Sequence, residues 1–421
     1  MRRFNVIAGW MSPEEKIGTC EIENARGRET ISFSFDPGWI SRHPDVRIDP
    51  MLTKAEGRQF PAAGTCFGFL SDIAPDRWGR TLMQRREASD AKEEGRPQRT
   101  LMDSDYILGV HDAGRIGGIR LADPETGGYL SDRESLAAPP MEKLRELESA
   151  VAKLESGSSD MKKCLKDLLD PGSSLGGARP KANIMDEKGS LWIAKFPSLT
   201  DSTDVGAWEM VAHNLAARCG LKVPEARALR LSPNGTTFLS KRFDRNGPVR
   251  VHYASAMTMT GRTDGEAAGY MDIADAIEQI SYDPVRDLRE IWARMTFSIC
   301  ISNTDDHLRN HGFLLNGGNW ELSPAFDINP NIDKQHMDLA ISSTTEKSLR
   351  EALEVAEFFR IGNAEASSVI HRIQSSVKDF WQYEASSLGI SQKEQRIMKD
   401  AFEEAYRDIS PKIESVHPTG C

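Results

Sequence analysis

A short hairpin between two polar segments constrains the fold of this chain more than any other feature of its sequence. Residues 303–330 read NTDDHLRNHGFLLNGGNWELSPAFDINP. Gly312–Leu315 and Trp320–Leu322 are predicted as two strands joined by a turn at Asn316–Asn319, because Gly and Asn tolerate the positive φ angles of tight turns. A hairpin folds the chain back on itself, so the Phe326 and Asp327 that follow it are expected to face the polar residues that precede it.

The polar residues on the two sides of this hairpin have a spacing that phosphoryl transfer uses. Asp305 and Asn310 form a D-x-x-x-x-N pair. In protein kinases an Asp in that frame accepts the proton of the substrate hydroxyl, and the Asn holds a magnesium ion. Asp327 stands where kinases place a second magnesium ligand. Each residue alone is more often part of an ordinary polar loop, but the three together favour a phosphate and metal site.

Two neighbours of Asp305 have more than one interpretation. Asp306 adds a carboxylate that could raise the pKa of Asp305 or contact a metal ion. His307 and His311 share a helical spacing, but no third ligand for a metal is obvious. His307 is therefore expected to orient the loop or to pack.

Cysteine spacing, net charge and the length of apolar runs argue against several classes of protein. The six cysteines are scattered without a C-x-x-C pair, which argues against a disulfide framework and a structural zinc site. A formal net charge of −10 does not suit a protein that wraps nucleic acid alone, although a basic partner could provide DNA contact. No apolar run has the length of a membrane span or of a signal peptide, so we expect a cytoplasmic protein without a membrane partner.

The middle of the chain holds a second candidate phosphate element. Residues 171–181 read PGSSLGGARPK, where Ser174, Gly176 and Gly177 allow close backbone approach to an anion, although the pattern is not a Walker A loop. A predicted hairpin follows, and its second strand carries Lys195 within an apolar run. Lysine is costly to bury without an anion, and kinases place there the lysine that meets the ATP phosphates. Glu209, on a predicted helix over 205–219, either pairs with Lys195 or is a surface residue.

The chain divides into three predicted parts. Residues 1–138 are β-rich with short helices, and an Ala-Ala-Pro-Pro run marks their end. Residues 139–245 hold the glycine-rich loop and Lys195, and residues 246–421 are mostly helical. The fold class is α+β: a two-lobed, protein-kinase-like fold with a β-rich N-terminal lobe, an added N-terminal subdomain and an all-helical C-terminal lobe.

Two helices can be placed in more detail. Pro75 suits the first turn of a helix that runs through Leu82 and Arg86. A second helix begins at Asp283 and delivers the chain to Asp305. Its predicted buried set is Val285, Leu288, Ile291, Trp292, Met295 and Ile299.

Four motifs together resemble the HipA family of serine/threonine kinase toxins from bacterial toxin–antitoxin modules. Phe67–Arg80 is similar to the family's F-G-F-x-x-D-x-x-P-D-x-W-G-R segment, and Ser174–Lys181 to its S-x-x-G-x-x-P-K loop. The segment around Asp305 and Asn310 resembles N-T-D-x-H-x-x-N, and the one ending at Asp327 resembles L-x-P-x-[FY]-D. The likeness covers nearly the whole chain.

This resemblance implies roles for individual residues. Asp305 would be the catalytic base, Asn310 and Asp327 the metal ligands, and Ser174 a serine whose autophosphorylation ejects its loop and switches the kinase off. Lys241 and Phe243 would bind adenine through their backbones. With ATP and Mg²⁺ as cofactors, the predicted cofactor-binding residues are Lys195, Ser174, Gly176, Gly177, Lys181, Lys241, Phe243 and His307.

The resemblance also implies partners. They are a small helix-turn-helix antitoxin (HipB-like), DNA through the antitoxin complex only, and a protein substrate such as a translation-related protein. Two alternatives stay open: a kinase-fold enzyme that phosphorylates a small molecule, and a nucleotide-binding co-repressor without catalysis.

Overall fold

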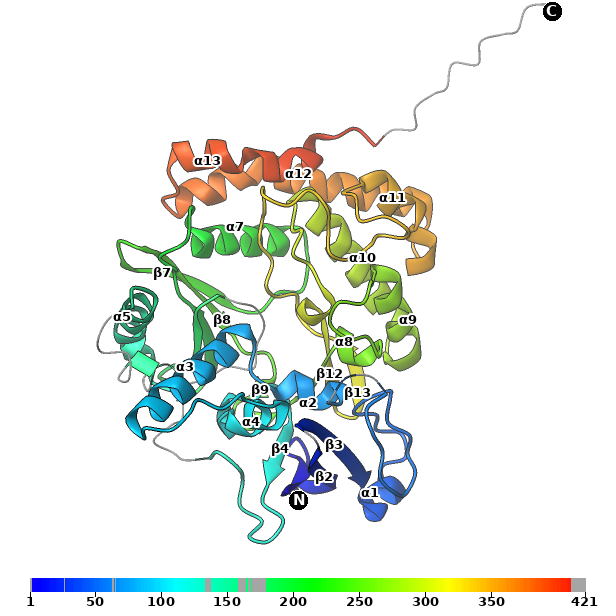
Figure 1. Ribbon diagram of the computed structural model, residues 1–421. Coiled ribbons are helices and arrows are strands. Elements are labelled where there is room, and N and C mark those ends of the chain that lie inside the picture. Colours follow the sequence, from blue (N-terminus) through cyan, green and yellow to red (C-terminus); the bar gives the residue numbers. More distant parts are fainter. Residues whose placement is uncertain are drawn as a thin grey trace, which may run out of the picture.

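The computed structural model describes residues 2–25, 27–62, 64, 66–132, 138–157, 164–165, 168 and 179–409. Figure 1 shows an arrangement in which α7 (Val205–Arg218) lies between a sheet and the helices of the C-terminal lobe. That lobe comprises α8 (Ala256–Met259), α9 (Tyr270–Ile280), α10 (Pro284–Cys300), α11 (Leu349–Glu354), α12 (Asn363–Ser387) and α13 (Gln392–Met398).

The N-terminal subdomain is built on an antiparallel sheet. Its strands β1 (Arg2–Ala8), β2 (Glu15–Ala25), β3 (Arg28–Phe35) and β4 (Ile119–Ala122) have the order β3-β2-β1-β4. Alternate residues such as Phe4, Val6 and Phe33 enter one core because side chains of a strand alternate between faces. The short helices of this part are α1 (Pro37–Arg42), α2 (Gly68–Ile73), α4 (Asp103–Gly109) and the 3-10 turn η1 (Asp112–Gly114).

A second antiparallel sheet positions the candidate site. Its strands β5 (Lys181–Met185), β6 (Leu191–Lys195), β7 (Ala226–Ser232) and β8 (Gly235–Lys241) have the order β5-β6-β8-β7. Trp192 and Ala194 of β6 join a buried cluster with α3 (Arg77–Glu93) and α5 (Leu144–Glu155). The strand's alternation turns Ile193 and Lys195 to the opposite face, which lines a cleft.

The predicted hairpin before Asp327 is present as β12 (Gly312–Asn316) and β13 (Asn319–Leu322). Its turn uses Gly317 at φ 58° and Gly318 at φ 87°, angles that favour glycine. With β11 (His252–Ser255) the hairpin forms a three-stranded sheet, beside the short ribbon β9 (Arg245–Asn246) and β10 (Val249–Arg250). The prediction of an all-helical C-terminal lobe is therefore wrong in this detail, because the lobe also contains these strands. The remaining 3-10 helices are η3 (Met141–Lys143), η4 (Leu308–Asn310), η5 (Ala356–Phe359) and η6 (Lys399–Tyr406).

Two local predictions were wrong. Val285 is 41% exposed, although the rest of its predicted set on α10 is buried. It lies in the first turn, next to the exposed Tyr282, so this turn extends beyond the elements that cover the buried stripe. Pro75 lies before α3, which begins at Arg77 because the Asp76 side chain caps it by accepting from the Gly79 N–H.

The proposed boundaries at 138 and 245 stay predictions, and α3 from the first part packs on the second sheet. Among the described helices, none combines the length and the apolar character that crossing a membrane requires.

Candidate active site

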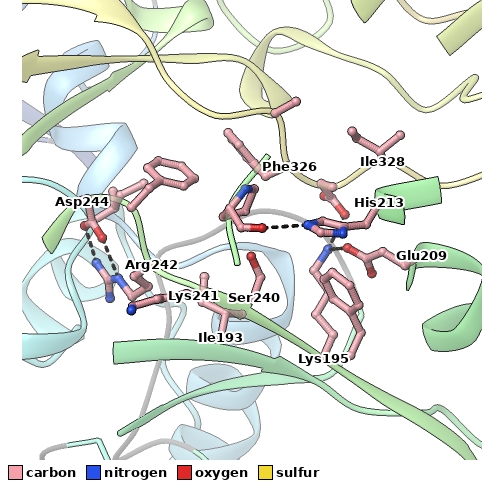
Figure 2. A pocket seen from close by; sticks show the side chains of 16 residues that line it. Ile193, Lys195, Glu209, His213, Ser240, Lys241, Arg242, Asp244, Phe326 and Ile328 are labelled. Atoms are coloured by element: carbon pink, nitrogen blue, oxygen red, sulfur yellow. Dashed lines mark hydrogen bonds and ion pairs between the residues drawn. The ribbon is translucent and has the colours of Figure 1, made fainter. Parts of the chain in front are cut away.

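A cleft of about 700 Å³ lies between the second sheet and the segment that follows the hairpin. Figure 2 shows its lining: Ile193 and Lys195 from β6, Glu209 and His213 from α7, the chain from Ser240 to Asp244, and Phe326 to Ile328. Aliphatic and aromatic side chains line this cleft together with charged groups, which suits a ligand that has both an apolar ring and an anionic part.

Lys195 is the charged centre of this cleft. Its side chain is 10% exposed, and its Nζ lies 2.5 Å from Glu209 Oε1 and 2.6 Å from Asp327 Oδ1. The predicted pairing with Glu209 is therefore present, and Asp327 joins it. Burial acts to lower the pKa of Lys195, but the two carboxylates outweigh burial and raise it, so the ammonium stays charged.

Asp327 is held in an uncommon conformation. Its φ of 58° lies in the left-handed region, which an Asp adopts at some cost and which is frequent at functional sites. Burial would raise the pKa of its carboxyl, but Lys195 and Lys181 together lower it to about 2. The carboxylate is thus ionised at neutral pH and available to a cation.

Asp305 is presented at the surface of a buried loop. The C-terminus of α10 and Ser302, at φ 51°, turn the chain so that Asp305 is exposed while Thr304 and Asp306 on either side are buried. Burial of part of the carboxyl raises the pKa of Asp305, and the neighbouring carboxylate of Asp338 raises it further, whereas His307 lowers it. Asp338 was not predicted from the sequence.

Asp306 has a structural setting. Its Oδ2 accepts from Tyr270 Oη at 2.5 Å and from Ser298 Oγ at 3.2 Å, and its Oδ1 lies 2.9 Å from His311 Nε2. Both oxygens are occupied by groups of the core. We therefore assign Asp306 to anchoring the loop rather than to contacting a metal, and the raised pKa of Asp305 has other causes.

Asn310 fits the predicted metal role. Its Nδ2 donates to the Asp305 carbonyl at 3.1 Å, which fixes the orientation of the amide. Its Oδ1 is buried, and among the described residues it has no hydrogen-bond partner. An unpartnered amide oxygen and an ionised Asp327 are hard oxygen donors of the kind that Mg²⁺ prefers. His307 lowers the pKa of both Asp305 and Asp327, so its ring lies within electrostatic reach of both.

The predicted hinge residues line the other end of the cleft. The Phe243 ring lies 5.4 Å from Phe326 and 6.2 Å from Tyr253 between centroids, and Lys241 reaches Glu225 at 3.4 Å. Their adenine contacts stay a prediction.

A buried charge network next to this hinge was not foreseen. Arg242 binds Asp244 through two hydrogen bonds, of 2.9 and 2.5 Å, and donates to the carbonyl oxygens of Gly114 and Arg115. Burial would raise the pKa of Asp244, but Arg242 and Arg245 outweigh burial and lower it. The network ties the hinge to the N-terminal subdomain.

Part of the predicted phosphate loop cannot be placed. Ser174, Gly176 and Gly177 lie outside the described residues. Lys181 opens β5, is buried, and lies 3.2 Å from Asp76 Oδ2. Sequence reasoning missed this partner, as it missed His213 and Ser240; Ile193 could have been found, because it alternates with Lys195 on the same face of β6.

Comparisons with known proteins place this architecture. Residues 173–381 match the family model described as the HipA-like C-terminal domain. No curated protein matches the chain in sequence. The structure resembles HipA in the Shewanella oneidensis MR-1 complex of HipA, HipB and operator DNA, with a TM-score of 0.62, 13% identity, and coverage of 96% of this chain and 95% of that one.

A slighter likeness, which carries no argument, is to the Helicobacter pylori proinflammatory kinase CtkA. Its TM-score is 0.42 at 17% identity, and the match covers 55% of this chain and 89% of that one. The predicted α+β, two-lobed kinase-like fold is confirmed by the likeness to HipA. With its HipA-like C-terminal domain and this fold along almost the whole length, the chain belongs to the HipA-type family.

Proposed function

We propose that this protein is an ATP- and Mg²⁺-dependent protein serine/threonine kinase and the toxin of a toxin–antitoxin pair. The observation that carries the proposal is the convergence of Lys195, Glu209 and Asp327 in one cleft, with two hydrogen bonds of 2.5 and 2.6 Å. Asp305 and Asn310 lie on the loop that precedes the hairpin leading to Asp327. A lysine fixed between two carboxylates, beside hard oxygen donors, is an arrangement that phosphoryl transfer from a nucleotide requires.

The residues would act mainly by positioning and by charge. Bound MgATP would supply the transferable phosphoryl group and the metal charge that screens it. Lys195, oriented by Glu209, would hold the phosphates, and the oxygens of Asn310 and Asp327 would hold the metal. Asp305 would accept the proton of the substrate hydroxyl, and its exposure leaves it accessible to a macromolecular substrate.

The proposal includes partners and control. The likeness to a HipA that was solved with HipB and operator DNA supports a helix-turn-helix, HipB-like antitoxin for this chain, with DNA contacted through that complex. The net charge of −10 is consistent with leaving the DNA contact to a basic partner. We further propose that autophosphorylation of Ser174 switches the kinase off and that the target is a cytoplasmic, translation-related protein.

The test is transfer of the γ-phosphate from labelled ATP to proteins of a cytoplasmic extract, with the wild type beside Asp305→Asn. We expect labelled protein bands with the wild type and a loss of at least 100-fold in the variant, since general-base catalysis contributes about 10²–10⁴-fold. Equal labelling by both proteins would contradict the role of Asp305. Label that enters only small molecules would favour the alternative of a small-molecule kinase, and ATP binding without any transfer would favour the co-repressor.

A further inference from the structure

The N-terminal motif at 67–80 reaches into both lobes, although the proposed mechanism gives it no task. Asp72 accepts from the N–H of Ser255 at 2.9 Å and from its hydroxyl at 2.6 Å, which joins α2 to the start of α8. Asp76 has two bonds of different kinds. Its Oδ1 accepts from the Gly79 N–H at 2.7 Å and caps α3, and its Oδ2 lies 3.2 Å from Nζ of Lys181 on β5.

The pair of Asp76 and Lys181 is buried more completely than a structural cap needs. The two side chains are 3% and 1% exposed. Taking both charges out of water is costly, and a buried ion pair is weak evidence for stability. A helix cap alone would be served by an uncharged Asn, Ser or Thr. The charge of Asp76 therefore needs another explanation.

Lys181 provides that explanation, because it pairs with Lys195 in the register of β5 and β6 and so stands beside the charged end of the cleft. Together with Lys195 it lowers the pKa of Asp327, so the ammonium of Lys181 and the carboxylate of Asp327 lie within electrostatic reach of each other. Five buried or partly buried groups thus form a series of alternating charge, each within reach of the next: Asp76, Lys181, Asp327, Lys195 and Glu209. The first of the five comes from the N-terminal subdomain.

We propose that Asp76 is a positioning residue of the nucleotide site: it holds Lys181 ready for a phosphate oxygen and keeps this lysine away from Asp327. The N-terminal subdomain would then complete the site of the kinase. The inference rests on the proposed function only in taking the ligand to be the phosphate groups of ATP. Without the charge of Asp76, the ammonium of Lys181 would be drawn towards Asp327, where it would compete with a divalent cation.

Asp76→Asn isolates this role, because Asn caps a helix as well as Asp does and only the charge is lost. Loss of the ion pair with Lys181 predicts ATP binding about tenfold to 100-fold weaker, measured by calorimetry. The Mg²⁺ concentration for half-maximal ATP binding rises, which a purely structural substitution would not cause. In nucleotide-free protein, we expect an amine-reactive ester to acylate Lys181 faster in Asp76→Asn than in the wild type. Peptide mass spectrometry measures the rate of this acylation.

The matched control is Asp36→Asn. Asp36 caps α1 by accepting from the Gly38 N–H at 2.9 Å, and it does not line the cleft. We expect wild-type ATP binding and Mg²⁺ dependence in this variant. A second test is Asp76→Asn in a Lys181→Met background, where no further loss of ATP affinity is expected, since Asp76 acts through Lys181.

Three results would overturn the inference: unchanged ATP and Mg²⁺ binding in Asp76→Asn, an equal further loss in the Lys181→Met background, or unchanged acylation of Lys181. Failure of the proposed function gives a different pattern. If the wild type binds MgATP without transferring phosphate, binding still decides the role of Asp76. If it does not bind MgATP, the inference falls together with the proposed function.

Discussion

Replacing Glu209 by Gln tests how the site orients its central lysine. The Glu209 side chain is 3% exposed, and its Oε1 accepts from Nζ of Lys195 at 2.5 Å. The substitution keeps the shape of the side chain and removes its charge. Because Asp327 also binds Lys195 at 2.6 Å, the lysine is not left alone in the empty enzyme.

The magnitude follows from these contacts. Removing one partner of a buried ion pair costs about 3–5 kcal/mol when the other charge is left uncompensated. Here Asp327 compensates it, and burial raises the pKa of Glu209, so the neutral amide also relieves a buried charge. We therefore expect the free energy of unfolding to change by no more than about 1 kcal/mol.

Phosphoryl transfer responds more strongly. With nucleotide bound, the metal would engage Asp327, and Glu209 would be the carboxylate that orients Lys195. Loss of a charged hydrogen bond there costs about 2–3 kcal/mol. That loss corresponds to about a 30- to 150-fold lower kcat/KM.

The assay is label transfer from γ-labelled ATP, with stability followed by thermal unfolding. Glu384→Gln is the matched control, because Glu384 is also buried and accepts 2.7 and 2.8 Å bonds from Arg218 and Asn214 of the same helix, α7. It does not line the cleft. Transfer by Glu209→Gln within about threefold of the wild type, or an equal loss in Glu384→Gln, would refute the reasoning.

Three further predictions follow from charges near the site and the core. In Asp327→Asn, we expect Mg²⁺ to add nothing to the thermal stabilisation by ATP, because a neutral amide binds Mg²⁺ poorly. Thermal unfolding with ATP, in the presence and absence of Mg²⁺, measures this. Because burial and Asp338 raise the pKa of Asp305, the acid limb of the pH–rate profile lies above the ordinary range of an aspartate, and Asp338→Asn moves it to lower pH; an unmoved limb contradicts this. His252 stacks on Trp10, and burial lowers its pKa to about 3. The unfolded chain therefore binds the proton more readily than the folded one, and the free energy of unfolding decreases as the pH falls from about 6.5 to 3. His252→Phe removes that slope in acid titrations of unfolding, and an unchanged slope assigns it to other groups.

Local sequence signals were enough to predict several of the elements around the cleft. The apolar run around Lys195 identified β6, and the Gly and Asn residues between β12 and β13 identified the turn. The start of α10 followed from Asp283, whose side chain caps the helix. These features depend on neighbours a few residues away, which a sequence displays directly.

Contacts between distant loops could not be predicted in that way. Asp76 meets Lys181, and Asp338 lies beside Asp305, because separate elements pack together, and no period or motif records which loops will touch. The position of Asp306 has the same origin: its partners Tyr270 and Ser298 lie on α9 and α10. The predicted burial of Val285 was wrong because the helical period shows which face of a helix is apolar, but not where the elements that pack on that face end.

Intact-mass analysis with phosphosite mapping tests the central claim most directly. The wild type and Asp305→Asn are purified, incubated with MgATP and compared. The proposed function predicts one added phosphate on Ser174 in the wild type and none in the variant. A wild-type protein that gains no phosphate and labels no protein of the extract, while Asp305→Asn behaves identically, would contradict the assignment of this cleft to a protein kinase.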